Sequence, residues 1–228
     1  MKTYAIIPSG GVGKRINSSL PKQYISIHGK ELIAYTLEIF QKCDQINEII
    51  VPAQKDYFEL LNKIKLEYGI SKLTGIIEGG NERQNSVLNA LESISPNDDD
   101  LIVVHDAARP LLPAKTLKNA LEAAIEFDNS IVAIKAKDTL VKGAEYVNEY
   151  LDREKVYYVQ TPQIFRYEVI NKAMILAKKD SFIGSDESIL VHHASNKIKI
   201  VEGSSFNFKV TTDSDLDLLK LITHIETF

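Results

Sequence analysis

The sequence predicts an α/β protein built on a mostly parallel, Rossmann-like sheet with helices on both faces. Short apolar runs bounded by turn residues are typical of strands that are covered on both faces. Between these runs, apolar residues recur at the spacing of amphipathic helices. Because the two patterns alternate, we expect parallel strands joined by helical crossovers.

Each expected element has its own segment. The expected strands are residues 4–8, 48–52, 101–104 and 131–134. The expected helices are marked by Leu32, Ile33, Leu37 and Phe40, by Val87, Leu88 and Leu91, by Leu117, Leu121, Ala124 and Ile125, and by Leu216, Leu219 and Ile222.

The length of 228 residues and a hydrophobic content of 44% fit a single domain, residues 1–228, with a sizeable core. One stretch, about 136–158, breaks the alternation. Polar and apolar residues alternate there around Gly143, which predicts a projecting β-arm. Because such an arm buries little by itself, we expect it to need another surface, such as a second subunit. An ordinary surface hairpin is the alternative.

Composition narrows the class of protein. The chain carries 27 basic and 31 acidic residues, a net charge of -4, which argues against binding nucleic acid or an anionic membrane. The single cysteine, Cys43, excludes an internal disulfide. No apolar run approaches the roughly 20 residues of a membrane helix, and the first apolar run is too short for a signal peptide. We therefore expect a cytoplasmic protein.

A glycine-rich loop follows the first expected strand. Residues 8–15 read Pro-Ser-Gly-Gly-Val-Gly-Lys-Arg, and glycines let backbone N–H groups approach phosphate oxygens. The loop is not a P-loop, because Lys14 is followed by Arg15. It is not a dinucleotide fingerprint either, because Ile16 stands at the third glycine position. With Lys22 just beyond, the cations predict a polyphosphate site; a plain tight turn with surface lysines is the alternative.

Six blocks in order carry a family resemblance. They are the glycine loop with Pro21-Lys22-Gln23-Tyr24, residues 79–87, residues 104–110, Lys137-Asp138-Thr139, residues 160–165 and residues 208–216. Together they resemble the cytidylyltransferases that make CDP-linked polyols from polyol phosphates. Within that family the sequence is most similar to the 2-C-methyl-D-erythritol 4-phosphate cytidylyltransferases, while the ribitol-5-phosphate cytidylyltransferases share most of the blocks.

The resemblance implies that 1–228 is a nucleotidyltransferase domain in which a substrate phosphate oxygen attacks the α-phosphorus of CTP. It assigns Arg15, Lys22 and Lys209 to catalysis. It assigns CTP binding to Pro8, Ser9, Gly10, Gly11, Gly13, Lys14, Gly80, Asn81, Arg83, Ser86, Asp106 and Ala107. It assigns the polyol phosphate to Arg109, Thr139, Arg153, Thr161 and Ser185. It also implies a homodimer in which the arm crosses to the partner subunit.

Asp106 follows the expected strand 101–104, so it should lie at the carboxyl edge of the sheet, where ligands bind. A carboxylate there can hold Mg²⁺ or another divalent cation, directly or through water, together with CTP phosphates. It can also contact ribose hydroxyls. The alternative is a structural ion pair with Arg109.

The sequence departs from the usual pattern of the family at three places. Ser9-Gly10 stands where Ala-Ala or Ala-Gly is usual, Asn81 where Asp is common, and Ser185 where Thr is usual.

Two other functions stay open: ribitol-5-phosphate cytidylyl transfer, and a regulatory nucleotide-binding module without catalysis. The second predicts loss of a charged site residue, yet all four charged residues expected at the site are present: Lys22, Asp106, Arg109 and Lys209.

Overall fold

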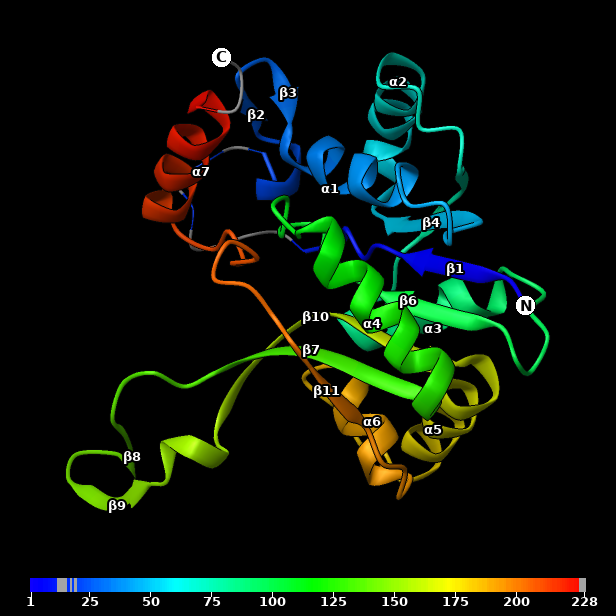
Figure 1. Ribbon diagram of the computed structural model, residues 1–228. Coiled ribbons are helices and arrows are strands. Elements are labelled where there is room, and N and C mark those ends of the chain that lie inside the picture. The colour runs from blue at the N-terminus through cyan, green and yellow to red at the C-terminus, as the bar shows by residue number, and fades with distance from the viewer. Residues whose placement is uncertain (12–15, 17, 19, 226–228) are drawn as a thin grey trace.

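The structure, a computed structural model, describes residues 1–11, 16, 18 and 20–225. Over these residues it is an α/β fold with one large sheet and a projecting arm (Figure 1). The strands are β1 (Thr3–Ile6), β2 (Ser26–Ile27), β3 (Lys30–Glu31), β4 (Glu48–Ala53), β5 (Leu73–Glu78), β6 (Leu101–Val104), β7 (Asn129–Lys135), β8 (Leu140–Gly143), β9 (Val147–Leu151), β10 (Tyr157–Arg166) and β11 (Lys199–Glu202). The α-helices are α1 (Leu32–Gln41), α2 (Phe58–Glu67), α3 (Arg83–Glu92), α4 (Ala114–Phe127), α5 (Tyr167–Lys179), α6 (Glu187–His193) and α7 (Asp213–Ile225).

The large sheet has the strand order β11-β7-β10-β6-β1-β4-β5. β1 pairs in parallel with β4 and β6, and β5 and β11 pair in parallel with β4 and β7. β10 runs antiparallel to its neighbours β6 and β7. The prediction of a mostly parallel sheet is therefore confirmed, and each of the four expected strands lies in it.

Helices cover both faces of the sheet, as the sequence predicts. On one face, apolar residues of α1, α2 and α4 pack against Ala5, Val51 and Val103. On the other face, apolar residues of α3, α5 and α6 pack against Ile6, Ile102 and Val104. Neighbouring residues of each central strand thus point to opposite faces, and both sets are buried, which explains why these strands read as continuous apolar runs.

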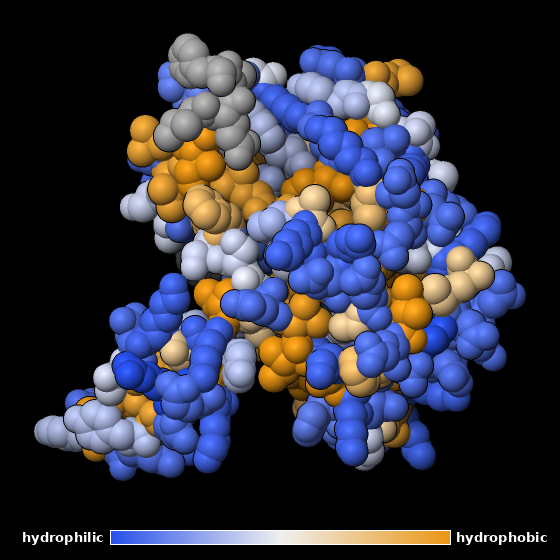
Figure 2. Space-filling view, in the orientation of Figure 1, coloured by the Kyte–Doolittle hydropathy of each residue, from blue (hydrophilic) through white to orange (hydrophobic). Residues whose placement is uncertain are grey.

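The arm is a two-stranded antiparallel sheet, β8 with β9, that pairs with no other strand of the described chain. It extends from the ends of β7 and β10, well away from the sheet (Figure 1), and forms a separate lobe in the space-filling view (Figure 2). The expected arm is slightly too long, because Tyr157 and Tyr158 already pair with β7 as the start of β10. No helix in the described part of the chain is long and apolar enough to span a membrane.

Candidate active site

A cavity of about 390 Å³ opens at the carboxyl edge of the parallel strands. Loops that follow β1, β5, β6 and β11 meet there, as expected for a ligand site in an open α/β sheet. Its lining is Pro8, Ser9, Gly10, Gly11, Lys22, Gln23, Gly80, Asn81, Glu82, Arg83, Ser86, Asp106, Ala107, Ala108, Lys209 and Thr211.

The cavity brings together most residues expected at the nucleotide. Ten of the twelve positions expected to bind CTP line it, together with Lys22 and Lys209. The remaining two, Gly13 and Lys14, and the expected catalytic residue Arg15 lie outside the described residues. Segments as far apart in the sequence as Pro8 and Thr211 therefore meet in one place.

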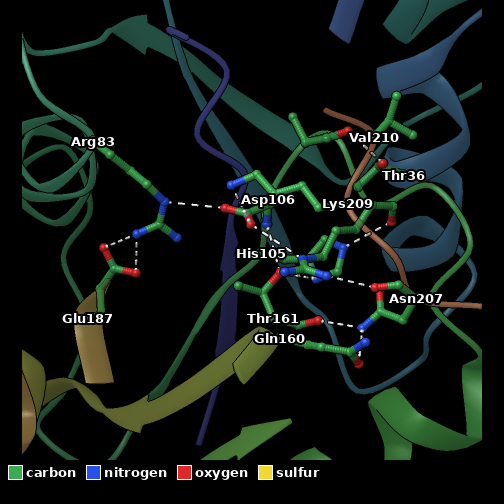
Figure 3. Close-up of polar contacts among 12 residues, drawn as sticks. Thr36, Arg83, His105, Asp106, Gln160, Thr161, Glu187, Asn207, Lys209 and Val210 are labelled. Atoms are coloured by element: carbon green, nitrogen blue, oxygen red, sulfur yellow. Dashed lines mark hydrogen bonds and ion pairs between the residues drawn. The ribbon is translucent and has the colours of Figure 1, made fainter. Parts of the chain in front are cut away.

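Asp106 is a carboxylate surrounded by three positively charged side chains (Figure 3). Its Oδ2 lies 3.0 Å from Lys209 Nζ and 3.4 Å from Arg109 Nε, and its Oδ1 lies 3.3 Å from Arg83 Nε. Burial alone would raise the pKa of Asp106, but Lys209, Arg83 and Arg109 outweigh burial and hold the pKa well below its ordinary value. The expected alternative, an Asp106–Arg109 ion pair, is thus present, and Asp106 lines the cavity at the same time.

Arg83 is held from the opposite side by Glu187. Its Nη1 lies 2.6 Å from both carboxylate oxygens of Glu187, whose side chain is 1% exposed. Burial disfavours the charge on Arg83, but Glu187 and Asp106 more than compensate and raise its pKa. Arg83 is therefore a fixed cation at the start of α3, between the cavity and the start of α6.

The backbone of Asp106 is held by a buried hydrogen-bonded layer that consists of Thr161, His105 and the backbone of Arg109. The backbone N–H of Asp106 donates to Thr161 Oγ1 at 3.0 Å, and that hydroxyl lies 3.1 Å from His105 Nδ1. His105 Nε2 lies 3.2 Å from the carbonyl oxygen of Arg109, which can only accept. Burial lowers the pKa of His105 to about 4, so the ring is neutral, with Nε2–H donating and Nδ1 accepting from Thr161. His105 therefore links Thr161 to the backbone of Arg109 as a buried, neutral ring.

Asn207 fixes the loop that carries Lys209. Its carbonyl oxygen accepts from Arg109 Nη1 at 2.7 Å. Its Nδ2 donates to the carbonyl oxygen of Thr161 at 2.8 Å and to Gln160 Oε1 at 3.2 Å. Because Asn207 is fully buried, these bonds place the loop, and with it Lys209, at a defined position beside Asp106.

The loop before α3 is pinned by Ser86. The Ser86 hydroxyl accepts from the Gly80 N–H at 3.0 Å and donates to the carbonyl oxygen of Glu82 at 3.1 Å. A Cβ at Gly80 would lie 2.3 Å from the Asn85 Cβ, so only glycine fits there. Ser86 therefore shapes this wall of the cavity with its hydroxyl as well as lining it.

The residues expected to bind the polyol phosphate are not gathered in this cavity. Arg109 and Thr161 do not line the cavity but contact Asp106, Arg109 through the carboxylate and Thr161 through the backbone N–H. Ser185 is exposed in the loop before α6. Thr139 and Arg153 are exposed in the arm, where Arg153 Nη1 donates to the carbonyl oxygen of Lys137 at 3.2 Å.

Some site residues were not assigned from the sequence. Gln23, Glu82, Ala108 and Thr211 line the cavity, and Glu187 anchors Arg83. Gln23, Glu82, Ala108 and Thr211 lie inside the sequence blocks that carry the resemblance, and Glu187 follows Ser185-Asp186 directly. Their position in or beside these blocks could have marked these residues as candidates, but it did not indicate what each side chain contacts.

These features, a Rossmann-like sheet with a cavity lined by basic side chains at the carboxyl edge of its parallel strands, are those of an α/β enzyme of the nucleotidyltransferase class. The chain belongs to the 2-C-methyl-D-erythritol 4-phosphate cytidylyltransferase family, whose model matches residues 3–224. The fold class, the enzyme class and the family expected from the sequence are thereby confirmed.

Relatives match along almost the whole chain. The 2-C-methyl-D-erythritol 4-phosphate cytidylyltransferase of Geotalea uraniireducens is 36% identical over 219 residues, covering 95% of this chain and 94% of the relative. That of Geobacter metallireducens is 37% identical, covering 96% of each. The solved 4-diphosphocytidyl-2C-methyl-D-erythritol synthase of Anaerococcus prevotii superposes with a TM-score of 0.86 at 25% identity, covering 98% of both chains.

Proposed function

We propose that this chain transfers the cytidylyl group of CTP to 2-C-methyl-D-erythritol 4-phosphate, a step of non-mevalonate isoprenoid precursor synthesis. A phosphate oxygen of the acceptor attacks the α-phosphorus of CTP. The bond from that phosphorus to the bridging oxygen breaks, and pyrophosphate leaves with the electron pair. The product is 4-diphosphocytidyl-2-C-methyl-D-erythritol.

One observation carries this proposal. In a chain of this family, a single cavity is lined by residues 8–11 of the glycine loop, by Lys22 and Lys209, and by Asp106, which is paired with Lys209. Both reactants are anions, so transfer depends mainly on charge neutralisation and positioning rather than on a protein nucleophile. Lys22 and Lys209 both line the cavity and supply positive charge there. The Lys22 Nζ donates to the carbonyl oxygen of Val210 at 2.6 Å, next in sequence to Lys209. Arg15 is proposed to add a third cation.

The loop of residues 79–86 is proposed to hold the cytosine base. Gly80 gives close access to the backbone, and Ser86 fixes that backbone through two hydrogen bonds. A pocket with fixed donors and acceptors rejects other bases, because mismatched polar groups would stay unpaired.

Mg²⁺ is the proposed cofactor, with Asp106 as its protein ligand. Among the described residues, no three acidic, histidine or cysteine side chains cluster as a ready metal site. The donor set still fits magnesium, which is commonly held by one or two carboxylates plus substrate phosphates. Because three cations contact Asp106, the ion should enter with CTP rather than alone. When bound, Mg²⁺ would neutralise phosphate charge.

The arm is proposed to complete the active site of a second subunit, carrying Thr139 and Arg153 to the acceptor phosphate. Supporting this, Tyr146 and Tyr150 of the arm are 81% and 71% exposed, and an isolated two-stranded hairpin is marginally stable in water.

Mixing Arg153→Ala and Lys209→Met chains tests the proposal. Shared sites predict recovery of about a quarter of wild-type activity in the mixture. Recovery of none would show that each chain uses its own arm.

We further propose a cytoplasmic location, for which the lone Cys43 is the supporting feature.

Ribitol-5-phosphate transfer is not favoured, because the relatives reported above are named for methylerythritol phosphate or its product. A regulatory module is not favoured either, because the charged site residues are retained and assembled.

Product identification tests the proposed reaction. CTP, 2-C-methyl-D-erythritol 4-phosphate and Mg²⁺ are incubated with the protein and followed by phosphorus NMR. The proposal expects a new pair of diphosphodiester resonances and one equivalent of free pyrophosphate. Release of CMP without that pair would show hydrolysis instead of transfer and would contradict the proposal.

A further inference from the structure

Two glutamines hold the carbonyl groups of the glycine loop. Gln23 Nε2 donates to the carbonyl oxygen of Ser9 at 2.6 Å and to that of Gly11 at 3.0 Å. Gln54 Nε2 donates to the carbonyl oxygen of Gly10 at 3.1 Å. Three consecutive carbonyl groups therefore accept from two side-chain amides. Such contacts require a side-chain N–H donor, which a carboxylate or a thioether lacks.

The orientation of these carbonyl groups sets the orientation of the next N–H groups. A trans peptide is planar, and its C=O and N–H point in opposite directions. Fixing the carbonyl groups of Ser9 and Gly10 thus fixes the N–H groups of Gly10 and Gly11. Within the described part of the chain, neither N–H donates to a protein acceptor, although both residues line the cavity.

Gln23 is itself held in a rigid setting. It is 4% exposed, and its neighbour Tyr24 is 2% exposed and stacks on Tyr57 with ring centroids 4.3 Å apart. The Ser9 hydroxyl donates to the Tyr24 hydroxyl at 2.8 Å, and the Ser9 N–H donates to the carbonyl oxygen of Pro52 at 2.8 Å. The serine that departs from the family pattern thus adds a second link between the loop and this segment.

We propose that Gln23 and Gln54 are positioning residues that hold the Gly10 and Gly11 N–H groups toward the triphosphate of CTP. This inference rests on the proposed function. Donors that are fixed before the ligand arrives need no reorganisation when it binds, which is the condition under which backbone amides stabilise phosphate charge best. The two side chains act through the loop rather than by touching the reacting atoms.

The test compares two ligands that share base and ribose but differ in phosphate. CTP and cytidine are titrated by calorimetry into the wild-type protein and into Gln23→Met and Gln54→Met. Methionine keeps the length of glutamine but cannot donate. Gln45→Met is the matched control, because Gln45 is exposed and lies before β4, at the opposite edge of the sheet. Thermal melting of each variant is measured to check that it is folded.

The proposal expects Gln23→Met to weaken CTP binding about tenfold and Gln54→Met a few fold, with cytidine affinity unchanged. Unchanged CTP affinity, or equal losses for CTP and cytidine, would overturn it, since a merely structural role weakens both ligands. If Gln23→Met does not fold, the half-buried Gln54→Met applies the same comparison. A wild-type protein that binds no CTP would refute the proposed function, and this inference with it.

Discussion

Arg83 meets Glu187 through a single nitrogen, Nη1, which lies 2.6 Å from both carboxylate oxygens. The same guanidinium reaches Asp106 with its Nε at 3.3 Å. A residue at the start of α6 is thereby linked to the central carboxylate of the cavity. Since Glu187 does not line the cavity, any effect on CTP must pass through Arg83.

Glu187→Gln removes the charge that orients Arg83 while keeping the shape of the side chain. We expect the free energy of unfolding to fall by about 2 kcal/mol, because the half-buried Arg83 loses the nearer of its two carboxylate partners and keeps only Asp106. The KM for CTP should rise several-fold. Urea unfolding and steady-state kinetics measure the two effects. Glu126→Gln, an exposed change on α4, is the control, and equal behaviour of the two variants would disprove the positioning of Arg83.

We expect the free energy of unfolding to fall in mild acid because His105 is buried in its neutral form. Its folded pKa of about 4 lies below the ordinary value of 6.5, so the unfolded chain binds a proton that the folded chain excludes. Its contribution is complete above about pH 6.5 and is lost as the pH falls toward 4. Between pH 7.5 and 5 this amounts to about 2 kcal/mol. Urea titrations of wild type and His105→Gln should show the steeper pH dependence in the wild type; parallel slopes would contradict the assignment.

Lys209→Gln should act on the chemical step more than on binding. Lys209 Nζ lies 3.0 Å from Asp106 and lines the cavity, so it can stabilise charge that develops on the α-phosphate. Loss of such a donor lowers kcat by about 10²–10³. Lys63→Gln, exposed on α2, is the matched control. A normal kcat with a raised KM would instead limit Lys209 to holding CTP.

Magnesium binding should depend on CTP. Isothermal titration of Mg²⁺ into the free protein should give no binding at millimolar concentration, because Lys209, Arg83 and Arg109 already neutralise Asp106. With a CTP analogue that cannot be cleaved, binding should become tighter than to the analogue alone. Asp106→Asn should abolish that gain. Tight binding of Mg²⁺ without nucleotide would be inconsistent with this picture.

The sequence was most informative where one strand decides the position of a residue. The expected strand 101–104 placed Asp106 at the carboxyl edge, and the expected strand 4–8, which the structure ends at Ile6, placed the glycine loop beside it. β10 was not predicted, because its polar residues Gln160, Thr161 and Gln163 become buried only through tertiary contacts.

Contacts between distant residues were not predictable either. Arg83 and Glu187 are 104 positions apart, and nothing local in either segment shows their pairing. Gln23 and Ser9 are 14 positions apart, and the contact depends on how the chain returns to the loop after Pro21. Both interactions follow from the fold rather than from a local pattern.

The most direct test of the account is the specificity of pyrophosphate release with CTP and Mg²⁺. Values of kcat/KM are compared for 2-C-methyl-D-erythritol 4-phosphate and D-ribitol 5-phosphate. The account predicts a preference of at least about 100-fold for the methylerythritol substrate. An equal or reversed preference would contradict the proposed substrate while leaving the CTP site in place. Release with neither acceptor, despite CTP binding, would contradict the proposed catalysis.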